Sequence, residues 1–221
     1  MMIGPVRLID IDPADLSAGA AYKLLVGIVV PRPIAWISTL NEGGGVNLAP
    51  FSCYTFVSND PPMIAVSCGR RNGVLKDTAR NARNRGEFVV NVVTEELATP
   101  MHQSSREHPS DTSEADRLGI TLQPSLIVRP PRVSAAPIAL ECQLRQVLEF
   151  GNLKSELLIG EVVRFRIAEH LIQDGKIDAM RWRPLARLAG PYYAHLGDVI
   201  AMHDVGDAGP TEQRSTCSAP S

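Results

Sequence analysis

A lysine, an aspartate and a threonine stand together at positions 76–78, near the start of a segment with helical spacing. Backbone amides at a helix start and the positive end of the helix dipole attract anions. Thr78 would add a hydroxyl donor and Lys76 a positive charge, so the triplet can bind a phosphate group. The alternative is a solvent-facing helix start in which Asp77 complements the dipole, and the residues alone favour this plainer interpretation.

A second group of polar residues surrounds the three consecutive glycines at positions 43–45. Ser38 and Thr39 end a predicted strand before the glycines, and a further polar segment follows them. The candidate binding residues of that segment are Asn47, Leu48, Ala49, Pro50 and Ser52. Amides and hydroxyls here could bind the polar edge of a ring or a row of hydroxyl groups, and the small Ala49 would let the backbone approach a flat ring. Ordinary turn chemistry is the alternative.

Three further residues could contribute to the same site. Arg32 lies between Pro31 and Pro33, which stiffen its backbone, and its guanidinium could bind a phosphate through two parallel hydrogen bonds. A salt-bridged residue at a bend is an equally good interpretation. Ser67 and Cys68 end a predicted strand, and Cys68 could equally be an inert buried thiol.

Motifs for several other chemistries are missing from the sequence. The glycines at positions 43–45 form no GxGxxG fingerprint, and no GxSxG motif occurs, so a hydrolase has little support. Glu95 and Glu96 are more typical of a solvated helix surface than of a catalytic pair. The histidines lack metal-ligand spacing and the cysteines form no CxxC pattern, so we expect no metal site.

Composition narrows the class of protein further. The chain has 221 residues, of which 44% are hydrophobic and 21% charged, enough for one domain with a substantial core. A formal net charge of −2 argues against a nucleic-acid or membrane-surface partner, because both attract a basic face. The sequence contains no apolar run long enough to cross a bilayer and no evident secretory signal. Four cysteines in a chain of this length predict reduced thiols and a cytoplasmic location.

Local patterns predict a mainly β fold. Runs of β-branched, aromatic or alternating residues predict strands over residues 24–30, 34–39, 51–57, 63–68 and 87–93, with two long strands around 140–145 and 163–167. Helices are predicted over residues 12–16, 74–83, 95–104 and 113–118. The expected caps are Asp12, Thr94 and either Asp111 or Thr112, and Gly86 should end the second helix. Few helices lie between strands, which favours an antiparallel barrel with short peripheral helices over a parallel sheet.

Five short motifs between positions 31 and 91 carry a resemblance to a known family. They are Pro31-Arg-Pro-Ile-Ala-Trp36, Asn47-Leu-Ala-Pro-Phe-Ser52, Asn59-Asp-Pro-Pro62, Lys76-Asp-Thr78 and Gly86-Glu-Phe-Val-Val-Asn91. In this order and spacing the chain resembles the flavin reductase-like family, the FMN-binding split barrels, which include flavoredoxin-like flavoproteins. Weaker matches follow at Glu141-Cys142, Ile159-Gly-Glu-Val162 and Arg187-Leu-Ala-Gly-Pro-Tyr192, so the resemblance spans about residues 16–193.

The resemblance implies a split β-barrel with peripheral short helices over residues 1–200. The tail over residues 204–221 is rich in Gly, Pro, Ser and Thr, which predicts disorder. The resemblance also implies FMN, or FAD, as the cofactor, because the segment at positions 76–78 lines the phosphate and ribityl region in relatives. The residues that it marks as flavin-binding are Arg32, Ser38, Thr39, Asn47, Leu48, Ala49, Pro50, Ser52, Ser67, Cys68, Lys76, Asp77 and Thr78. In similar proteins two subunits pack barrel to barrel near the flavin, so we expect a homodimer. The segments 181–183 and 187–193 would close the pocket or the subunit interface.

Three functions remain open at this stage. The first is an NAD(P)H:flavin oxidoreductase, in which NADH or NADPH passes a hydride to flavin N5 and reduced flavin can leave for a partner monooxygenase. The protein then supplies position while the cofactor carries the chemistry, which suits a sequence without an obvious catalytic dyad. The second is a flavoredoxin-like electron carrier that holds FMN and does not oxidise NAD(P)H. The third is a split barrel that binds a different ligand and no flavin.

Overall fold

The computed structural model describes residues 6–109 and 112–202, and begins with a short helical arm. Asp12 caps the 3-10 turn η1 (Pro13–Asp15), as predicted, through its Oδ1 atom 2.8 Å from the Ala14 amide. Helix α1 (Ala18–Ile28) follows, so the strand predicted over residues 24–30 is wrong. Ser17 caps α1, and the helix that starts there continues through the β-branched residues that had suggested a strand.

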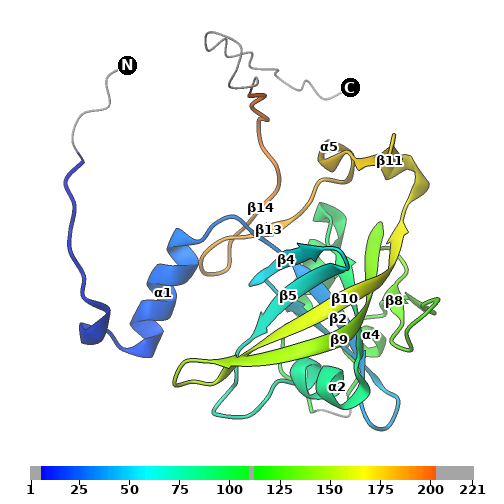
Figure 1. The fold of residues 1–221 in the computed structure, drawn as a ribbon, viewed down its shortest axis with the longest axis horizontal. Coiled ribbons are helices and arrows are strands. Elements are labelled where there is room, and N and C mark those ends of the chain that lie inside the picture. Colours follow the sequence, from blue (N-terminus) through cyan, green and yellow to red (C-terminus); the bar gives the residue numbers. More distant parts are fainter. Residues whose placement is uncertain (1–5, 110–111, 203–221) are drawn as a thin grey trace.

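Seven antiparallel strands form the main sheet, in the order β3-β2-β6-β9-β10-β5-β4. Their bounds are β2 (Ala35–Leu40), β3 (Val46–Phe51), β4 (Tyr54–Asn59), β5 (Pro62–Cys68), β6 (Glu87–Val92), β9 (Ile138–Phe150) and β10 (Ser155–Ile167). Because β3 and β5 also contact each other, the sheet curls into a barrel (Figure 1). The predicted mainly β fold is confirmed.

The polar segment after the glycines is strand β3 rather than a turn, and the strand predicted over residues 51–57 is split between β3 and β4. Pro50 is tolerated in β3 because β3 ends the hydrogen-bonded order of the sheet, where one side of a strand needs no ladder donor. The remaining predicted strands of the barrel are confirmed, but the two long ones extend well beyond their predicted ranges, since β9 continues to Phe150 and β10 begins already at Ser155.

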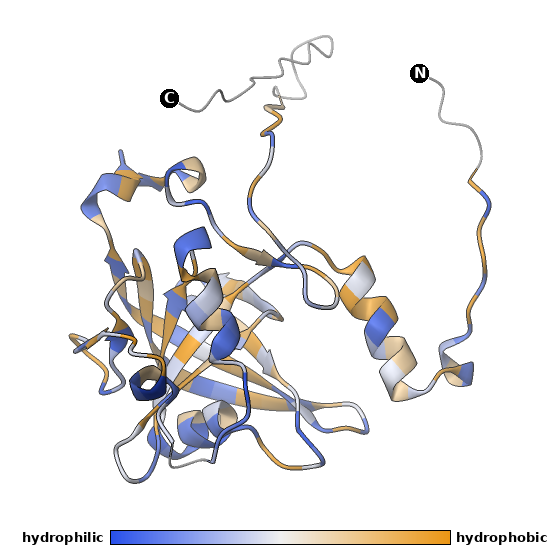
Figure 2. Ribbon diagram, turned by 180° about the vertical axis from the view of Figure 1, so that it is seen from behind, coloured by the Kyte–Doolittle hydropathy of each residue, from blue (hydrophilic) through white to orange (hydrophobic). Residues whose placement is uncertain are grey.

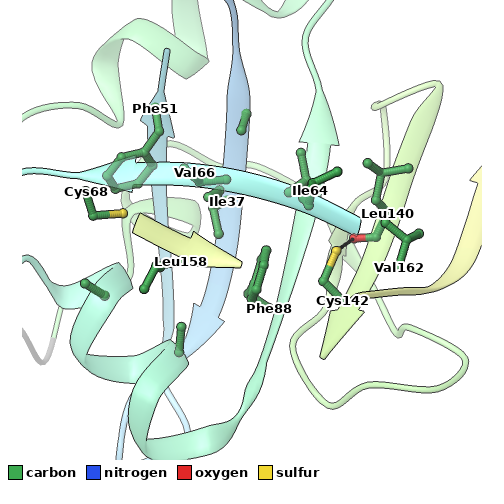
Figure 3. Close-up of a cluster of buried hydrophobic side chains, with 14 of the residues drawn as sticks. Ile37, Phe51, Ile64, Val66, Cys68, Phe88, Leu140, Cys142, Leu158 and Val162 are labelled. Carbon is green, nitrogen blue, oxygen red and sulfur yellow. Dashed lines mark hydrogen bonds between the residues drawn. The ribbon is translucent and has the colours of Figure 1, made fainter. Parts of the chain in front are cut away.

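Apolar side chains from both halves of the sheet fill the barrel (Figure 3). The ring of Phe88 is buried, and Gly160 on β10 passes directly against it. A Cβ atom at Gly160 would lie 2.5 Å from Phe88 Cζ, so only glycine leaves room for the ring. The pairing of β9 with β10 shifts register between Ile159 and Gly160, which bends the strand at this contact.

Short helices cover the barrel. Helix α2 (Asp77–Arg85) begins three residues later than predicted, after Lys76, and ends as predicted at Gly86, whose φ of 72° favours glycine. The segment after β6 forms η2 (Glu95–Leu97) and α3 (Ala98–Gln103). Helix α4 (Glu114–Arg117) is capped by Ser113 rather than by Thr112, and Asp111 lies outside the described residues.

After β10 the chain leaves the barrel in an excursion of short elements. The excursion contains η3 (Glu169–Leu171), β11 (Ile172–Gln173), β12 (Lys176–Ile177) and α5 (Ala179–Trp182). A small sheet then joins β1 (Arg32–Pro33), β13 (Ala186–Arg187) and β14 (Tyr193–Ala194), and a ribbon joins β7 (Leu122–Gln123) to β8 (Arg132–Val133). The tail predicted over residues 204–221 lies outside the described residues.

Helix α1 stands away from the barrel, as Figures 1 and 2 both show. Every residue of α1 is at least partly exposed, including apolar ones such as Leu25 (60%) and Ile28 (74%). This monomer therefore presents apolar surface that its own barrel does not cover. Among the described residues, none of the helices has the length and apolar character needed to span a membrane.

Candidate functional site

Six of the predicted binding residues line one cavity of about 420 Å³ between β3 and the start of α2. They are Asn47, Ala49, Pro50, Lys76, Asp77 and Thr78. The two polar segments that the sequence pointed to, residues 47–52 and 76–78, therefore meet at a single hollow surface. A volume of this size lies within the range of small-molecule sites in proteins.

A buried hydrogen-bond network joins the two segments behind the cavity wall. The Asn47 amide nitrogen donates to Thr78 Oγ1 at 2.9 Å and lies 3.2 Å from Thr39 Oγ1. Thr39 Oγ1 also accepts from the Asn81 amide at 3.1 Å. All four side chains are buried, so the network fixes the first turn of α2 against β2 and β3.

The start of α2 is suited to an anion. Among the described residues, no side chain caps this helix start, so its first-turn amides remain available as donors beside the positive end of the helix dipole. Lys76 adds a charge; its ammonium lies 5.4 Å from the centre of the Phe51 ring. Asp77 pairs with Arg80 one turn later, which offsets its negative charge next to the cavity.

Glu114, which the sequence did not single out, also lines the cavity and fixes β3 from outside. Its Oε2 atom accepts the Leu48 amide at 2.9 Å, so a carboxylate takes the place that a neighbouring strand would occupy. The side chain is only 6% exposed. Burial raises the pKa of the Glu114 carboxyl, with the nearby Asp77 charge acting in the same direction, while the Leu48 hydrogen bond and His108 oppose the shift.

Three predicted residues support the wall without lining the cavity. Ser38 and Thr39 are fully buried on β2, and Ser38 Oγ donates to the Pro131 carbonyl. The Leu48 side chain is also fully buried and packs in a cluster around Trp36.

Arg32 and Ser52 meet at a different place. The Arg32 guanidinium donates to the carbonyls of Val26 (2.8 Å), Val29 (2.6 Å) and Leu188 (3.0 Å), and to Ser52 Oγ (3.3 Å). It is buried and binds the end of α1 and the turn after β13, at the bend that one interpretation of the sequence expected. Neither Arg32 nor Ser52 is among the residues that line the cavity in the described part of the chain.

Ser67 and Cys68 end β5 beside β10. The Ser67 amide donates to the Cys53 carbonyl at 2.8 Å. Cys68 is 1% exposed and packs in the barrel core near Phe51 (Figure 3). Burial raises the pKa of the Cys68 thiol to about 12, so the thiol is neutral near pH 7 and inert as a nucleophile.

A further part of the cavity lining comes from the loop after α3, which sequence reasoning missed. Ser104, Ser105, Arg106, Glu107 and His108 all contribute to the lining. Ser104 anchors the loop because its hydroxyl accepts the indole N–H of the buried Trp36 at 2.9 Å. Glu107 forms an ion pair with Arg71, another residue of the lining. The polar composition of residues 104–108 does not indicate that this loop lies next to β3. That position depends on the tertiary fold.

A family model for the flavin reductase like domain matches residues 27–186. The uncharacterized protein YwrF of Bacillus subtilis is 42% identical over 194 residues, which cover 85% of this chain and 95% of that protein. The chain therefore belongs to the flavin reductase-like family, and its fold is the split barrel of that family.

Two solved structures are similar over most of this chain. Nitrilotriacetate monooxygenase component B from Bacillus cereus superposes with a TM-score of 0.88 at 36% identity, covering 90% of this chain and 100% of that one. The 2-nitrobenzoate 2-nitroreductase NbaA of Pseudomonas fluorescens gives a TM-score of 0.81 at 32% identity, covering 91% and 100%.

Proposed function

We propose that this cavity binds FMN and that the protein is an NAD(P)H-dependent flavin oxidoreductase. The observation that carries the proposal is the meeting of the Lys76–Thr78 segment with β3 at one cavity, beside a helix start that no described side chain caps. The phosphate would bind the first-turn amides of α2, the Thr78 hydroxyl and the Lys76 charge. FAD contains the same ring and ribityl units and is the alternative cofactor.

The chain's own residues would hold and orient the flavin. In this proposal Asn47, Ala49 and Pro50 form the wall along the ring and ribityl chain, because their backbone is fixed by pairing with β2 on one side. Ser38, Thr39 and Leu48 would hold that wall in place from behind. Arg32, Ser52, Ser67 and Cys68 lie outside the lining, and we assign them to the stability of the surrounding strands rather than to direct contact.

The chemistry supplied by bound flavin would be acceptance of a hydride from NADH or NADPH at N5. The protein would contribute position, since holding two reactants together converts a bimolecular step into a nearly unimolecular one. Two similar solved structures support a reductase role. One is named as a component of a monooxygenase and the other as a nitroreductase, at 36% and 32% identity.

The same proposal includes a second copy of the chain and a cytoplasmic location. Leu25 and Ile28 on α1 are 60% and 74% exposed, and Tyr192 near β14 is 68% exposed, so α1 and the segment before β14 both present apolar surface. Packing of two copies would cover such surface, as in obligate dimers. The three described cysteines are free thiols, which suits a reducing compartment. A monooxygenase that receives reduced flavin is the partner suggested by the component B relative.

Anaerobic reduction tests the proposal directly. The FMN-loaded protein would be mixed with NADH or NADPH while flavin absorbance is followed, with free FMN at the same concentration as the control. Bleaching much faster than the control supports the reductase. A protein that binds FMN but ignores both nucleotides would be an electron carrier, and one that fails to bind any flavin would contradict the whole proposal.

A further inference from the structure

Glu114 differs from the other carboxylates of the proposed flavin cavity, because within the described part of the chain it forms no ion pair. The charged lining consists of the cations Arg71, Lys76 and Arg106 and the carboxylates Asp77, Glu107 and Glu114. Glu107 pairs with Arg71, and Asp77 pairs with Arg80. Glu114 is also the most buried of the three carboxylates, at 6% exposed. A buried carboxylate without a cation beside it is costly to keep charged, so the protonation of Glu114 is sensitive to any new charge in the cavity.

The protein holds the Glu114 side chain in place. Its Oε2 atom accepts the Leu48 amide at 2.9 Å, which ties the carboxyl to β3. The next residue, Ala115, is fully buried in the cluster around Trp36, and this contact anchors the backbone of α4. A carboxyl held in this way is not free to turn away from the cavity when another anion arrives. Uptake of a proton is the response that remains.

Charges on two neighbouring elements act on Glu114. Burial raises the pKa of the Glu114 carboxyl, and Asp77, the first residue of α2, adds to the rise. The backbone hydrogen bonds from Leu48 and from Glu114 itself lower the pKa, as does the charge of His108 in the loop after α3. A phosphate on the first-turn amides of α2 would lie at the same helix start as Asp77 and would carry up to two negative charges. It would therefore raise the pKa of Glu114 further.

We propose that Glu114 takes up a proton from solvent when a phosphate-bearing flavin enters the cavity, so that retention of the flavin depends on pH. The coupling rests on the proposed function, because it requires an anionic cofactor at the start of α2. A protonated carboxyl still offers an acceptor oxygen to the Leu48 amide. The cavity wall therefore stays in place while the negative charge of Glu114 disappears.

The direction of the pH dependence follows from the two pKa values of Glu114, one in the flavin-free protein and a higher one in the complex. Where Glu114 is protonated in both states, binding is at its strongest. As pH rises through the pKa of the flavin-free protein, binding must put back the lost proton and the affinity falls. The fall ends above the pKa of the complex, and a difference of one pKa unit between the two states weakens binding tenfold in all.

FMN affinity measured by flavin fluorescence between pH 5 and pH 8 tests the coupling in the full-length protein. Glu114→Gln keeps an acceptor for Leu48 but cannot titrate, so the FMN affinity of the wild type relative to this variant should fall about tenfold across the range. Ionisation of the FMN phosphate affects both proteins and cancels in the ratio. His108 titrates in the same range, so the comparison is repeated with His108→Gln in both proteins, where the fall should persist. Asp116→Asn, exposed on the same helix and outside the lining, should follow the wild type.

Riboflavin, which lacks the phosphate, separates the charge effect from a structural role of Glu114. Its affinity for the wild type relative to Glu114→Gln should not change with pH, whereas a purely structural role would change the riboflavin and FMN ratios alike. Isothermal titration of the wild type at pH 7, in buffers of different ionisation enthalpy, counts the protons without any variant. It should show net proton uptake with FMN and none with riboflavin.

Three results would overturn the coupling alone. They are FMN affinities of wild type and a folded Glu114→Gln that change in parallel with pH, a riboflavin ratio that changes as the FMN ratio does, and FMN binding at pH 7 without proton uptake. Circular dichroism would establish that the variants fold. Protein that binds no FMN at any pH would instead overturn the proposed function and the coupling with it.

Discussion

Glu114 offers the sharpest test of how the cavity wall is held. Replacing it by alanine removes the acceptor of the Leu48 amide, which is buried behind β3. An unsatisfied buried donor costs about 1–3 kcal/mol. For a protein of this size each kcal/mol lowers Tm by roughly 2–4 °C, so Glu114→Ala should lower Tm by about 2–12 °C. Glu114→Gln keeps an acceptor oxygen and should cost much less.

The pH dependence of protein stability distinguishes the effect of the Glu114 charge from that of its hydrogen bond to Leu48. Because burial raises the folded-state pKa of Glu114 above its ordinary value of 4.5, the folded state holds this proton more tightly than the unfolded state. The stability that the group contributes is therefore complete below its ordinary pKa and is lost as pH rises through the raised folded pKa. Glu114→Gln does not titrate, so its stability relative to wild type should improve between pH 5 and pH 8.

Thermal unfolding followed by circular dichroism at pH 5 and pH 8 measures both effects. Asp77 and His108 are present in all variants, so the comparison between glutamate and glutamine tests the proton on residue 114. The reasoning is refuted if the Tm of Glu114→Ala lies within about 1 °C of the wild-type Tm. Loss of the hydrogen bond should lower Tm by more than that. It is also refuted if the difference between Glu114→Gln and wild type is the same at both pH values.

Three further predictions follow from the packing. Gly160→Ala should destabilise the protein by about 1–3 kcal/mol in urea unfolding, since its Cβ would meet the Phe88 ring at 2.5 Å, and adding Phe88→Leu should restore part of the loss; a neutral Gly160→Ala would contradict this contact. Iodoacetamide at pH 8 should modify Cys53, which is exposed, and spare Cys68, as read by peptide mass mapping; equal labelling in the native state would refute the burial of Cys68. Arg32→Ala should increase hydrogen exchange at the end of α1, and unchanged exchange would show that the arginine is not what holds it.

The sequence correctly predicted where a helix begins or ends when one residue alone determines that boundary. Asp12 and Gly86 were correctly identified as a cap and a helix stop, because each acts through its own backbone neighbours. The strand predicted over residues 24–30 failed for the opposite reason. Val and Ile there favour a strand only when a sheet covers them, whereas Ser17 had already started a helix that continues through them.

The sequence predicted those residues of the candidate site whose role depends on their own side-chain chemistry. Asn47 and Thr78 were chosen for what their side chains can donate, and the structure brings them within 2.9 Å. Glu114 and the loop 104–108 were missed because their contribution depends on how α3 and α4 pack on β3, which the local pattern does not encode. Arg32 shows that the chemistry of a side chain does not by itself identify its binding partner. Its guanidinium suits a phosphate, yet here it binds backbone carbonyls of the bend it belongs to.

The most direct test of the central claim is an equilibrium titration of FMN into flavin-free protein, followed by flavin fluorescence. The proposal predicts one FMN per chain in the wild type. In the proposal the Thr78 hydroxyl would contact the phosphate, so Thr78→Val should weaken binding by about tenfold or more, since a hydrogen bond to a charged group contributes about 1.5–3 kcal/mol. The exposed Thr99→Val on α3 is the matched control and should bind as the wild type does. Wild-type protein that does not bind FMN, or a folded Thr78→Val variant with unchanged affinity, would contradict the assignment of this cavity to flavin.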